Sequence, residues 1–508
     1  MQRRTLLRAA PLSALALLMG PGSIARVLAA DTERVSLAFP FDVVSWDPTA
    51  RIIPQATSLY KCVFDQPLQY DERNQLAGGV VSAYQWTDDS GLELALDFRD
   101  DVYFHNGDKL TSEDFKYTFE ERLKADQSLQ LGFIWSGIER IETPSPTRAV
   151  IHFSKPFVTA PQYLGFAGSF ILPKRYIEQV GMEAFLAKPI GSGPYKLVEY
   201  QRNNRVVLEA FDRYWGGIPT LREVSIQIIP NPTSRVSALQ SGQVAFSYAL
   251  PIRDALRLGD MPNLTSALTV TVDTYLIHML DKAPLDDINV RLAMHHAIDK
   301  EVLSRALLDG DPQPLSMPSP PGTPAHDEHF SMAFDAQKAR DYLARSGYSL
   351  SNPVRFKFFA TNGVHPVDNQ MARAIVQMWS KVGIQAELET IDMGKYFQSV
   401  AAGTLEGPAL WLWNNSTADP ELYSGSYLNA DTVFSVWRSE DVMERLRPLL
   451  VERDYANRIA GYQAFERWAV EQGYSLPLLQ GVSSVAHTTA LRYQPFQNGW
   501  MLPSRWHV

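Results

Sequence analysis

One segment constrains the fold of this chain more than any other: a helical pattern that ends at a glycine and continues as a strand. Between 367 and 382, apolar residues recur at the i, i+3, i+4 spacing of a helix with one buried face. Gly383 ends this pattern, and a strand begins at 384–388. A helix joined through a glycine to a strand is typical of α/β proteins. The sequence therefore predicts a mixed α/β fold built of more than one sheet.

Other segments predict the same alternation of strands and helices. Thr111, followed by acidic residues in the next turn, signals the start of a helix to about Leu123. A second helix is expected at 233–241, and the Pro-rich stretch 312–324 is expected to be a loop. Apolar runs predict strands at 35–39, 92–98, 194–198, 206–209, 224–229 and 410–413.

The composition indicates a large globular protein. The chain has 508 residues, of which 45% are hydrophobic and 20% charged, and this length allows about three domains at ~150 residues each. Cys62 is the only cysteine, so an intramolecular disulfide is excluded and stability must come from a large core. We interpret Cys62 as an inert buried thiol.

The first 30 residues have the layout of a secretory signal. Paired arginines at 3 and 4 resemble a twin-arginine signal, and an apolar run from Ala9 to Met19 leads to small residues at 29–30. That run is interrupted by Pro11 and is too short to span ~30 Å of hydrocarbon. No cysteine lies near the cleavage point, so a lipid anchor is not expected. We therefore expect an exported, periplasmic protein.

The charge balance excludes nucleic acid as a partner. Segment 1–30 holds four arginines and no acid, so its removal changes the net charge from −9 to −13. Phosphate backbones are bound by patches of Lys and Arg, which an acidic surface does not supply. The charge suits a soluble protein, and we expect a monomer.

None of the catalytic motifs considered occurs with the neighbouring residues that its chemistry requires. The Gly-Ser-Gly-Pro at 191–194 is followed by a strand pattern, whereas a phosphate-binding loop must lead into a helix. The chain has no Gly-x-Ser-x-Gly motif for a nucleophilic serine, and no pair of acids suggests hydrolysis. We interpret 191–194 as a structural turn and expect no enzyme.

Metal binding is only weakly indicated. His295 and His296 are adjacent and point to different faces of a helix. His326 and His329 flank two acids beside the Pro-rich loop, where a solvated surface is the simpler interpretation. The sequence therefore predicts neither a metal nor a cofactor.

The segment 410–420 is the strongest candidate for a binding site. An apolar strand leads through Trp413 into a polar loop that contains Asn414, Asn415, Ser416 and Asp419. Small-molecule pockets combine apolar walls with a few placed polar groups. A core strand closed by a turn explains the pattern equally well, so physics alone leaves both interpretations open.

Five blocks of the chain resemble the family 5 extracellular solute-binding proteins, of the dipeptide and oligopeptide type. The blocks occur in family order at 102–114, 191–197, 214–217, 235–242 and 286–300, and the resemblance covers nearly the whole mature chain. It implies a two-lobe periplasmic binding protein fold with a hinge and an extra subdomain in the first lobe. The expected boundaries are 31–270 and 480–508 for the first lobe, about 60–188 for its extra subdomain, and 271–479 for the second lobe.

The resemblance also implies a function. Such proteins capture a peptide or a peptide-like small solute by closing on it, and then meet the permease subunits of an ABC importer. Binding by closure needs no covalent chemistry. The alternatives are a non-peptide solute, such as a sugar conjugate, an opine-like compound or a metal complex, and a secreted enzyme.

Two positions depart from the peptide-binding pattern. Ser416 stands where peptide binders carry the Asp that holds the ligand amine, and Asn362 falls near the Arg that takes the ligand carboxylate. Neutral groups bind charges less strongly, because charge-assisted hydrogen bonds are roughly twice as strong. We therefore hypothesise that the ligand is not an ordinary dipeptide zwitterion. Arg51 and His365 are further candidates for ligand contact.

Overall fold

A computed structural model describes residues 33–43, 45–50, 56–87, 90–126, 129, 132–166, 168–432 and 435–508. The expected signal segment 1–30 and the candidate Arg51 lie outside these ranges. Among the described residues, no helix has both the length and the apolar character that crossing a membrane requires.

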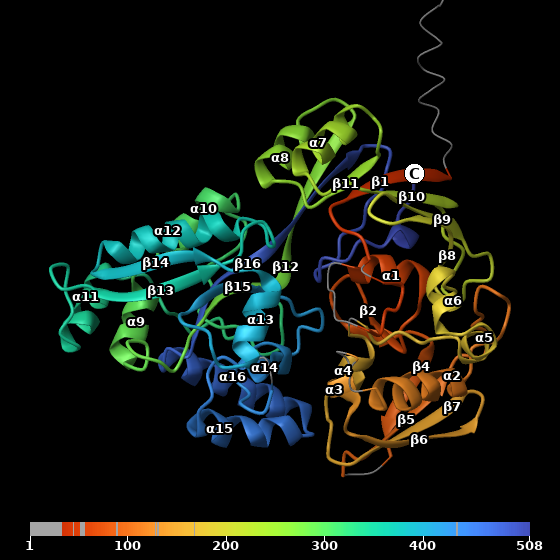
Figure 1. Ribbon diagram of the computed structural model, residues 1–508, viewed down its shortest axis with the longest axis horizontal. Helices are drawn as coiled ribbons and strands as arrows, with labels where there is room; N and C mark the ends of the chain where they lie inside the picture. The colour runs from red at the N-terminus through yellow and green to blue at the C-terminus, as the bar shows by residue number, and fades with distance from the viewer. Residues whose placement is uncertain are drawn as a thin grey trace, which may run out of the picture.

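A ten-stranded mixed sheet runs through the whole molecule, and its two ends form two lobes (Figure 1). The strand order is β14-β13-β15-β12-β16-β11-β1-β10-β9-β8. The first lobe contains β1 (Arg34–Phe39), β8 (Tyr195–Gln201), β9 (Arg205–Ala210), β10 (Glu223–Ile228) and β11 (Phe246–Tyr248). The second lobe contains β13 (Val354–Ala360), β14 (Ile384–Thr390) and β15 (Ala409–Trp413).

Two long antiparallel strands, β12 (Leu264–His278) and β16 (Ser475–Thr488), connect the lobes. Their pairing shifts register between Val270 and Thr274, so residues 271–273 form an irregular segment where β12 passes from one lobe to the other. The Val272 N–H donates instead to the carbonyl of Gln497, at 2.9 Å. Residues 271–273, where β12 passes from one lobe to the other, are called the hinge segment below.

The first lobe carries an extra subdomain with its own hydrophobic core (Figure 1). Its four-stranded sheet has the order β4-β5-β7-β6, and β2 pairs with β3 beside it. The strands are β2 (Leu68–Tyr70), β3 (Leu76–Gly78), β4 (Val81–Trp86), β5 (Glu93–Phe98), β6 (Ile138–Ser145) and β7 (Arg148–Phe153). The helices of the first lobe and this subdomain are α1 (Thr57–Val63), α2 (Ser112–Lys116), the π-helix η2 (Tyr117–Lys124), α3 (Gly132–Trp135), α4 (Ala160–Leu164), α5 (Lys174–Val180), α6 (Met182–Ala187), α7 (Pro232–Gln240), α8 (Ile252–Gly259) and the 3-10 helix η4 (Pro503–Arg505).

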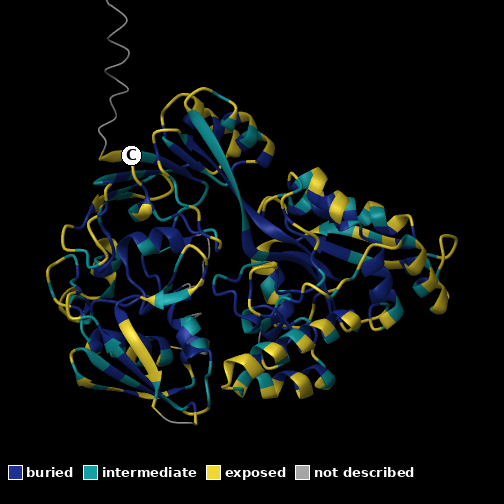
Figure 2. Ribbon diagram, turned by 180° about the vertical axis from the view of Figure 1, so that it is seen from behind, coloured by how far each residue is buried: buried dark blue, intermediate teal, exposed yellow. Residues whose placement is uncertain are grey.

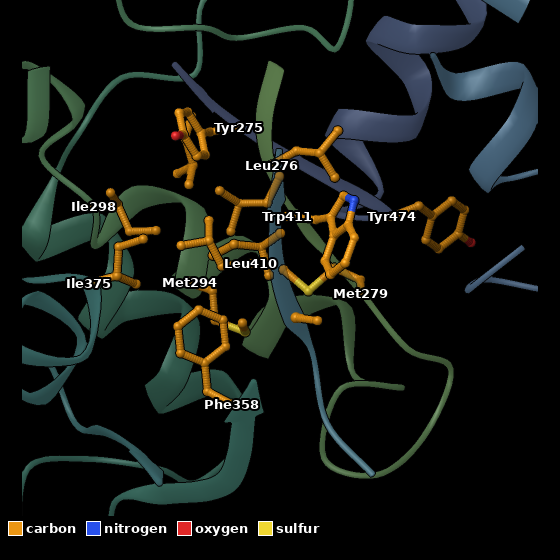
Figure 3. Packing of buried hydrophobic residues seen from close by; sticks show 14 of the residues in the cluster. Tyr275, Leu276, Met279, Met294, Ile298, Phe358, Ile375, Leu410, Trp411 and Tyr474 are labelled. Carbon is orange, nitrogen blue, oxygen red and sulfur yellow. The ribbon is translucent and has the colours of Figure 1, made fainter. Parts of the chain in front are cut away.

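Helices pack against the second lobe's strands and enclose a large apolar core. Phe358, Ile375 and Leu410 belong to this core, together with Met294 and Trp411 (Figure 3). The burial colours of Figure 2 show the same arrangement, with β16 buried and the outer helix faces exposed. The helices are α9 (Ile288–His296), α10 (Lys300–Leu307), α11 (Ala336–Arg345), α12 (Asp368–Ser380), α13 (Met393–Ala401), the 3-10 helix η3 (Pro420–Leu422), α14 (Ser424–Tyr427), α15 (Glu440–Val451) and α16 (Tyr455–Glu471).

The strands and helices expected from the sequence are present, with differences at their ends. The helix expected at 367–382 is α12, which ends at Ser380 and begins after Val367, a residue with a left-handed φ of 52°. The helix that starts at Thr111 continues as the π-helix η2, a change that periodicity does not reveal. The 312–324 stretch contains no helix or regular strand, and Leu315 pairs with Leu478 of β16 at 2.9 Å.

Candidate ligand-binding site

The 414–419 loop follows β15 at the level of the hinge segment. In the β12–β15 ladder, Trp413 lies opposite Thr274, one residue after Asp273. The Trp413 indole is half-buried, and its N–H donates to the carbonyl of Leu422. Its ring meets His278 edge-on, with centroids 5.4 Å apart. These contacts anchor the start of the loop in the second lobe.

Asn415 determines the shape of this loop. Its side-chain oxygen accepts from the Thr417 hydroxyl at 2.7 Å and from the Thr417 N–H at 3.1 Å. Its amide donates to the carbonyl of Asp419 at 2.8 Å, and its backbone N–H donates to Asp273 at 3.1 Å. Asn415 is fully buried, so its polar atoms serve the fold of the loop.

Asp419 is held in a buried ion pair. Its two carboxylate oxygens accept from Arg458 at 2.7 and 2.9 Å, and one of them also accepts the Glu421 N–H at 2.9 Å. Arg458 also donates to Glu421, at 3.2 Å. Burial raises the pKa of Glu421 to about 7, although Arg458 opposes this shift. Both carboxylate oxygens of Asp419 therefore already have hydrogen-bond partners within the protein.

Ser416 and Asn414 differ from Asn415 and Asp419 in their hydrogen bonds. The Ser416 hydroxyl oxygen is enclosed yet has no hydrogen-bond partner among the described residues. Asn414 is half-buried, and its side chain hydrogen-bonds to Asp273. An enclosed hydroxyl without a partner costs free energy unless a ligand or water completes it.

The loop before α12 lies beside the 414–419 loop, because β13 runs parallel to β15. Asp368 organises it by accepting the Thr361 hydroxyl at 2.6 Å and the Gly363 N–H at 3.0 Å. Asn362 is exposed. His365 is buried edge-on against Trp411, with centroids 5.1 Å apart.

His365 is electrically neutral in this environment. Burial lowers the pKa of His365 to about 4, although Asp368 opposes this shift. The His365 Nε2 has no hydrogen-bond partner among the described residues. A neutral imidazole next to an indole can offer one donor or acceptor to an uncharged polar group.

Sequence reasoning missed Asp273. Its carboxylate lies in the hinge segment, where it accepts from Asn415 and contacts Asn414. Burial raises the pKa of Asp273 to about 6, and these hydrogen bonds oppose the shift. No signal in the sequence marked this residue, because an isolated acid within a strand pattern has no motif.

Cys62, which the sequence also singled out, is part of the packed interior. Cys62 is buried and donates to the Ser58 carbonyl at 3.3 Å, and burial raises the pKa of its thiol to about 12. No group of three metal-ligating side chains occurs within the described ranges. One surface pocket of about 220 Å³ is lined by residues of 280–282, 399–405 and 435–438. Another pocket, of about 350 Å³, is lined by residues of 104–114 and 173–178. Neither includes the 414–419 loop.

The fold and the position of this loop define a two-lobe binding protein, with candidate ligand groups next to a hinge segment. The sequence matches the family description "Bacterial extracellular solute-binding proteins, family 5 Middle" over residues 75–434. The chain belongs to this family.

Individual relatives agree with the assignment. The glutathione-binding protein GsiB of Salmonella paratyphi A is 24% identical over 343 residues, which cover 67% of this chain and 65% of that protein. Helicobacter pylori DppA in complex with the peptide STSA has a TM-score of 0.80 at 20% identity, covering 94% of this chain and 98% of the other. AgaA from A. tumefacien R10 in complex with agropinic acid has a TM-score of 0.77 at 21% identity, covering 92% and 97%.

Proposed function

We propose that this chain is the exported, periplasmic solute-binding component of an ABC importer. It binds a peptide or peptide-like small solute between its lobes and delivers the solute to the permease subunits. It acts by binding alone. The observation that carries this proposal is the hinge segment 271–273, which is bonded to both lobes. Closure about such a segment removes a ligand from water and produces a shape that a transporter can distinguish.

The proposed lobes are 31–270 with 480–508, including an extra subdomain near 60–188, and 271–479. Three of the hydrophobic clusters support this division in outline: one lies mostly within 271–479, one in the first lobe, and one, between Leu68 and Ile171, in the subdomain. Closure at the rim of the proposed cleft is supported by Thr159 of the subdomain, whose hydroxyl donates to Glu421 of the second lobe at 3.0 Å.

The proposed ligand contacts come from the two adjacent loops. Trp413 supplies an apolar wall, while Asn414, Ser416, Asn362 and His365 supply uncharged polar groups. Asn415 and Asp419 act through the shape of the loop, as their internal hydrogen bonds support. Arg51 is a further proposed contact for an anionic group of the solute.

An opine-like solute is the second candidate. The fold neighbour AgaA is described in complex with agropinic acid. Ser416 and Asn362 argue against an ordinary dipeptide as the ligand, because neither can neutralise a terminal charge.

Native mass spectrometry of the exported protein tests the proposal. A mass excess that disappears on denaturation, followed by identification of the released solute, is the expected result. Small-angle scattering should then show a smaller radius of gyration after the solute is added back to emptied protein. A protein that neither retains nor responds to any solute from a rich growth medium would contradict the proposed function.

A further inference from the structure

The hinge segment places one carboxylate between the two lobes. Asp273 is half-buried, immediately before the residue that pairs with Trp413. Gly481 of β16 lies opposite, and a side chain there would approach Asp273 Cβ at 3.3 Å, so the strands meet closely at this point. The neighbours of Asp273 come from both lobes. The adjacent Val272 donates its N–H to the carbonyl of Gln497 in the first lobe at 2.9 Å, and its carbonyl accepts from the hydroxyl of Tyr423 in the second lobe.

No cation neutralises this carboxylate within the described ranges. Its partners are neutral: the Asn415 N–H at 3.1 Å, the Asn414 side chain and, more distantly, the Thr271 hydroxyl at 3.4 Å. The other enclosed acids of this region differ, since Asp419 and Glu421 both bind Arg458. A half-buried anion without a cation is costly to keep ionised, and a ligand cation lowers that cost.

We infer that Asp273 binds a protonated amine of the transported solute, which is therefore a molecule with a primary or secondary ammonium group. This inference rests on the proposed function, and it narrows the class of solute. An ammonium group donates two or three hydrogen bonds. Asp273 supplies the charged acceptor, and the enclosed, unpartnered Ser416 hydroxyl, next to Asn415, supplies a neutral one.

The inference also accounts for the neutral residue at 416. Here the negative charge comes from the strand that crosses between the lobes, and the loop carries a hydroxyl. A charge on the crossing strand lies where both lobes close, so the cation it binds is sealed from water when they meet. The competing explanation is that Asp273 only holds the loop by accepting the Asn415 N–H. The variant Asp273→Asn distinguishes the two explanations, because its side-chain carbonyl oxygen accepts the same N–H without the charge.

The experiment exposes emptied, mature-length protein to two pools of solutes. One pool is untreated yeast extract, and the other is the same extract treated with acetic anhydride, which converts primary and secondary amines to uncharged amides. Wild type, Asp273→Asn and the matched control Asp335→Asn are compared by native mass spectrometry. Asp335 also accepts backbone N–H bonds, from Gln337 and Lys338 at 2.9 Å, but it caps an outer helix.

We expect wild type and D335N to retain solute from the untreated pool and at least tenfold less from the acetylated pool. D273N should retain at least tenfold less from the untreated pool. Equal retention by wild type from both pools would overturn the inference and leave the proposed function standing. Equal retention by D273N and wild type would overturn it as well. If wild type retains nothing from either pool, the proposed function itself fails. The wild-type comparison needs no variant, so it holds even if D273N does not fold.

Discussion

The hydroxyl of Thr159 donates a 3.0 Å hydrogen bond to Glu421 Oε2 across 262 residues of sequence. Thr159 precedes α4 in the extra subdomain, and Glu421 lies in the second lobe. The hydrogen bond therefore connects the extra subdomain with the second lobe. Both residues are largely buried. The Glu421 oxygen that Thr159 contacts also accepts from Arg458, and Arg458 donates to Asp419 at the end of the 414–419 loop. The contact between the subdomain and the second lobe is therefore linked to this loop.

Replacing Thr159 by valine should weaken ligand binding. The substitution keeps the shape of the side chain but removes a donor to a charged group, worth roughly 1.5–3 kcal/mol. We expect about tenfold weaker binding of the recovered solute by titration calorimetry, with unchanged thermal unfolding. Thr87→Val is the control, because Thr87 donates to Glu93 at 2.9 Å within the subdomain. Equal effects of the two variants would contradict a role of Thr159 in closure.

Asp419→Asn should destabilise the second lobe. Arg458 and Asp419 side chains are only 4% and 6% exposed, and removing one partner of a buried pair typically costs about 3–5 kcal/mol. We expect the lower end, since Glu421 remains beside Arg458. Urea unfolding measures the loss, and the exposed pair Arg257–Asp254 gives the control D254N, expected within about 0.5 kcal/mol. Weakened ligand binding with unchanged stability would instead make Asp419 a ligand contact.

Glu466 should make stability depend on pH. It is fully buried and accepts from Ser319 and Ser424, at 2.9 Å from each hydroxyl. Burial raises the pKa of Glu466 from 4.5 to about 7, and the charge of Asp419 adds to the shift. A folded-state pKa above the unfolded value gives stability that is complete below pH 4.5 and is lost as the pH rises through 7.

The expected size is about 3 kcal/mol, because one pKa unit corresponds to about 1.4 kcal/mol. Urea unfolding of wild type and Glu466→Gln from pH 4.5 to 8 measures it. Wild type should lose stability relative to the variant as the pH rises, with most of the change below pH 7. Parallel pH profiles for the two proteins would show that the carboxyl of Glu466 has no such role.

Much of the fold was predictable because the recognisable sequence blocks are structural. His105 of the first block accepts the Gly191 N–H at 3.2 Å, so two distant blocks lie together. A side chain on Gly191 would come within 2.0 Å of the Val63 carbonyl, which explains why a glycine turn stands there. Arg235 donates to four backbone carbonyls, and Arg291 to three. These residues identify the family without contacting the candidate site.

The candidate site was predictable only in part. The step from an apolar strand with two tryptophans to an amide-rich stretch pointed to the 414–419 loop, but not to which of its side chains face inward. Asn415 and Asp419 have the same polar character as Asn414 and Ser416, and only the hydrogen bonds separate them. Asp273 enters the site through an irregularity in strand pairing, and such irregularities depend on contacts between segments that are distant in sequence.

Ser416→Asp should change the preference of the site among peptides. Wild type is expected to bind the dipeptide Met-Leu more weakly than micromolar, because Asn362 supplies no positive charge for the ligand carboxylate and Ser416 supplies no negative charge beyond that of Asp273. A carboxylate at 416 adds a charge-assisted hydrogen bond to the ligand amine, worth roughly 1.5–3 kcal/mol, so affinity should rise at least tenfold. Calorimetry at pH 8 keeps Asp273 ionised, since its pKa lies near 6. Ser416→Asn is the control of similar size without charge. Micromolar binding of Met-Leu by wild type would refute the hypothesis that simple dipeptides are not the ligands, whatever the variants do.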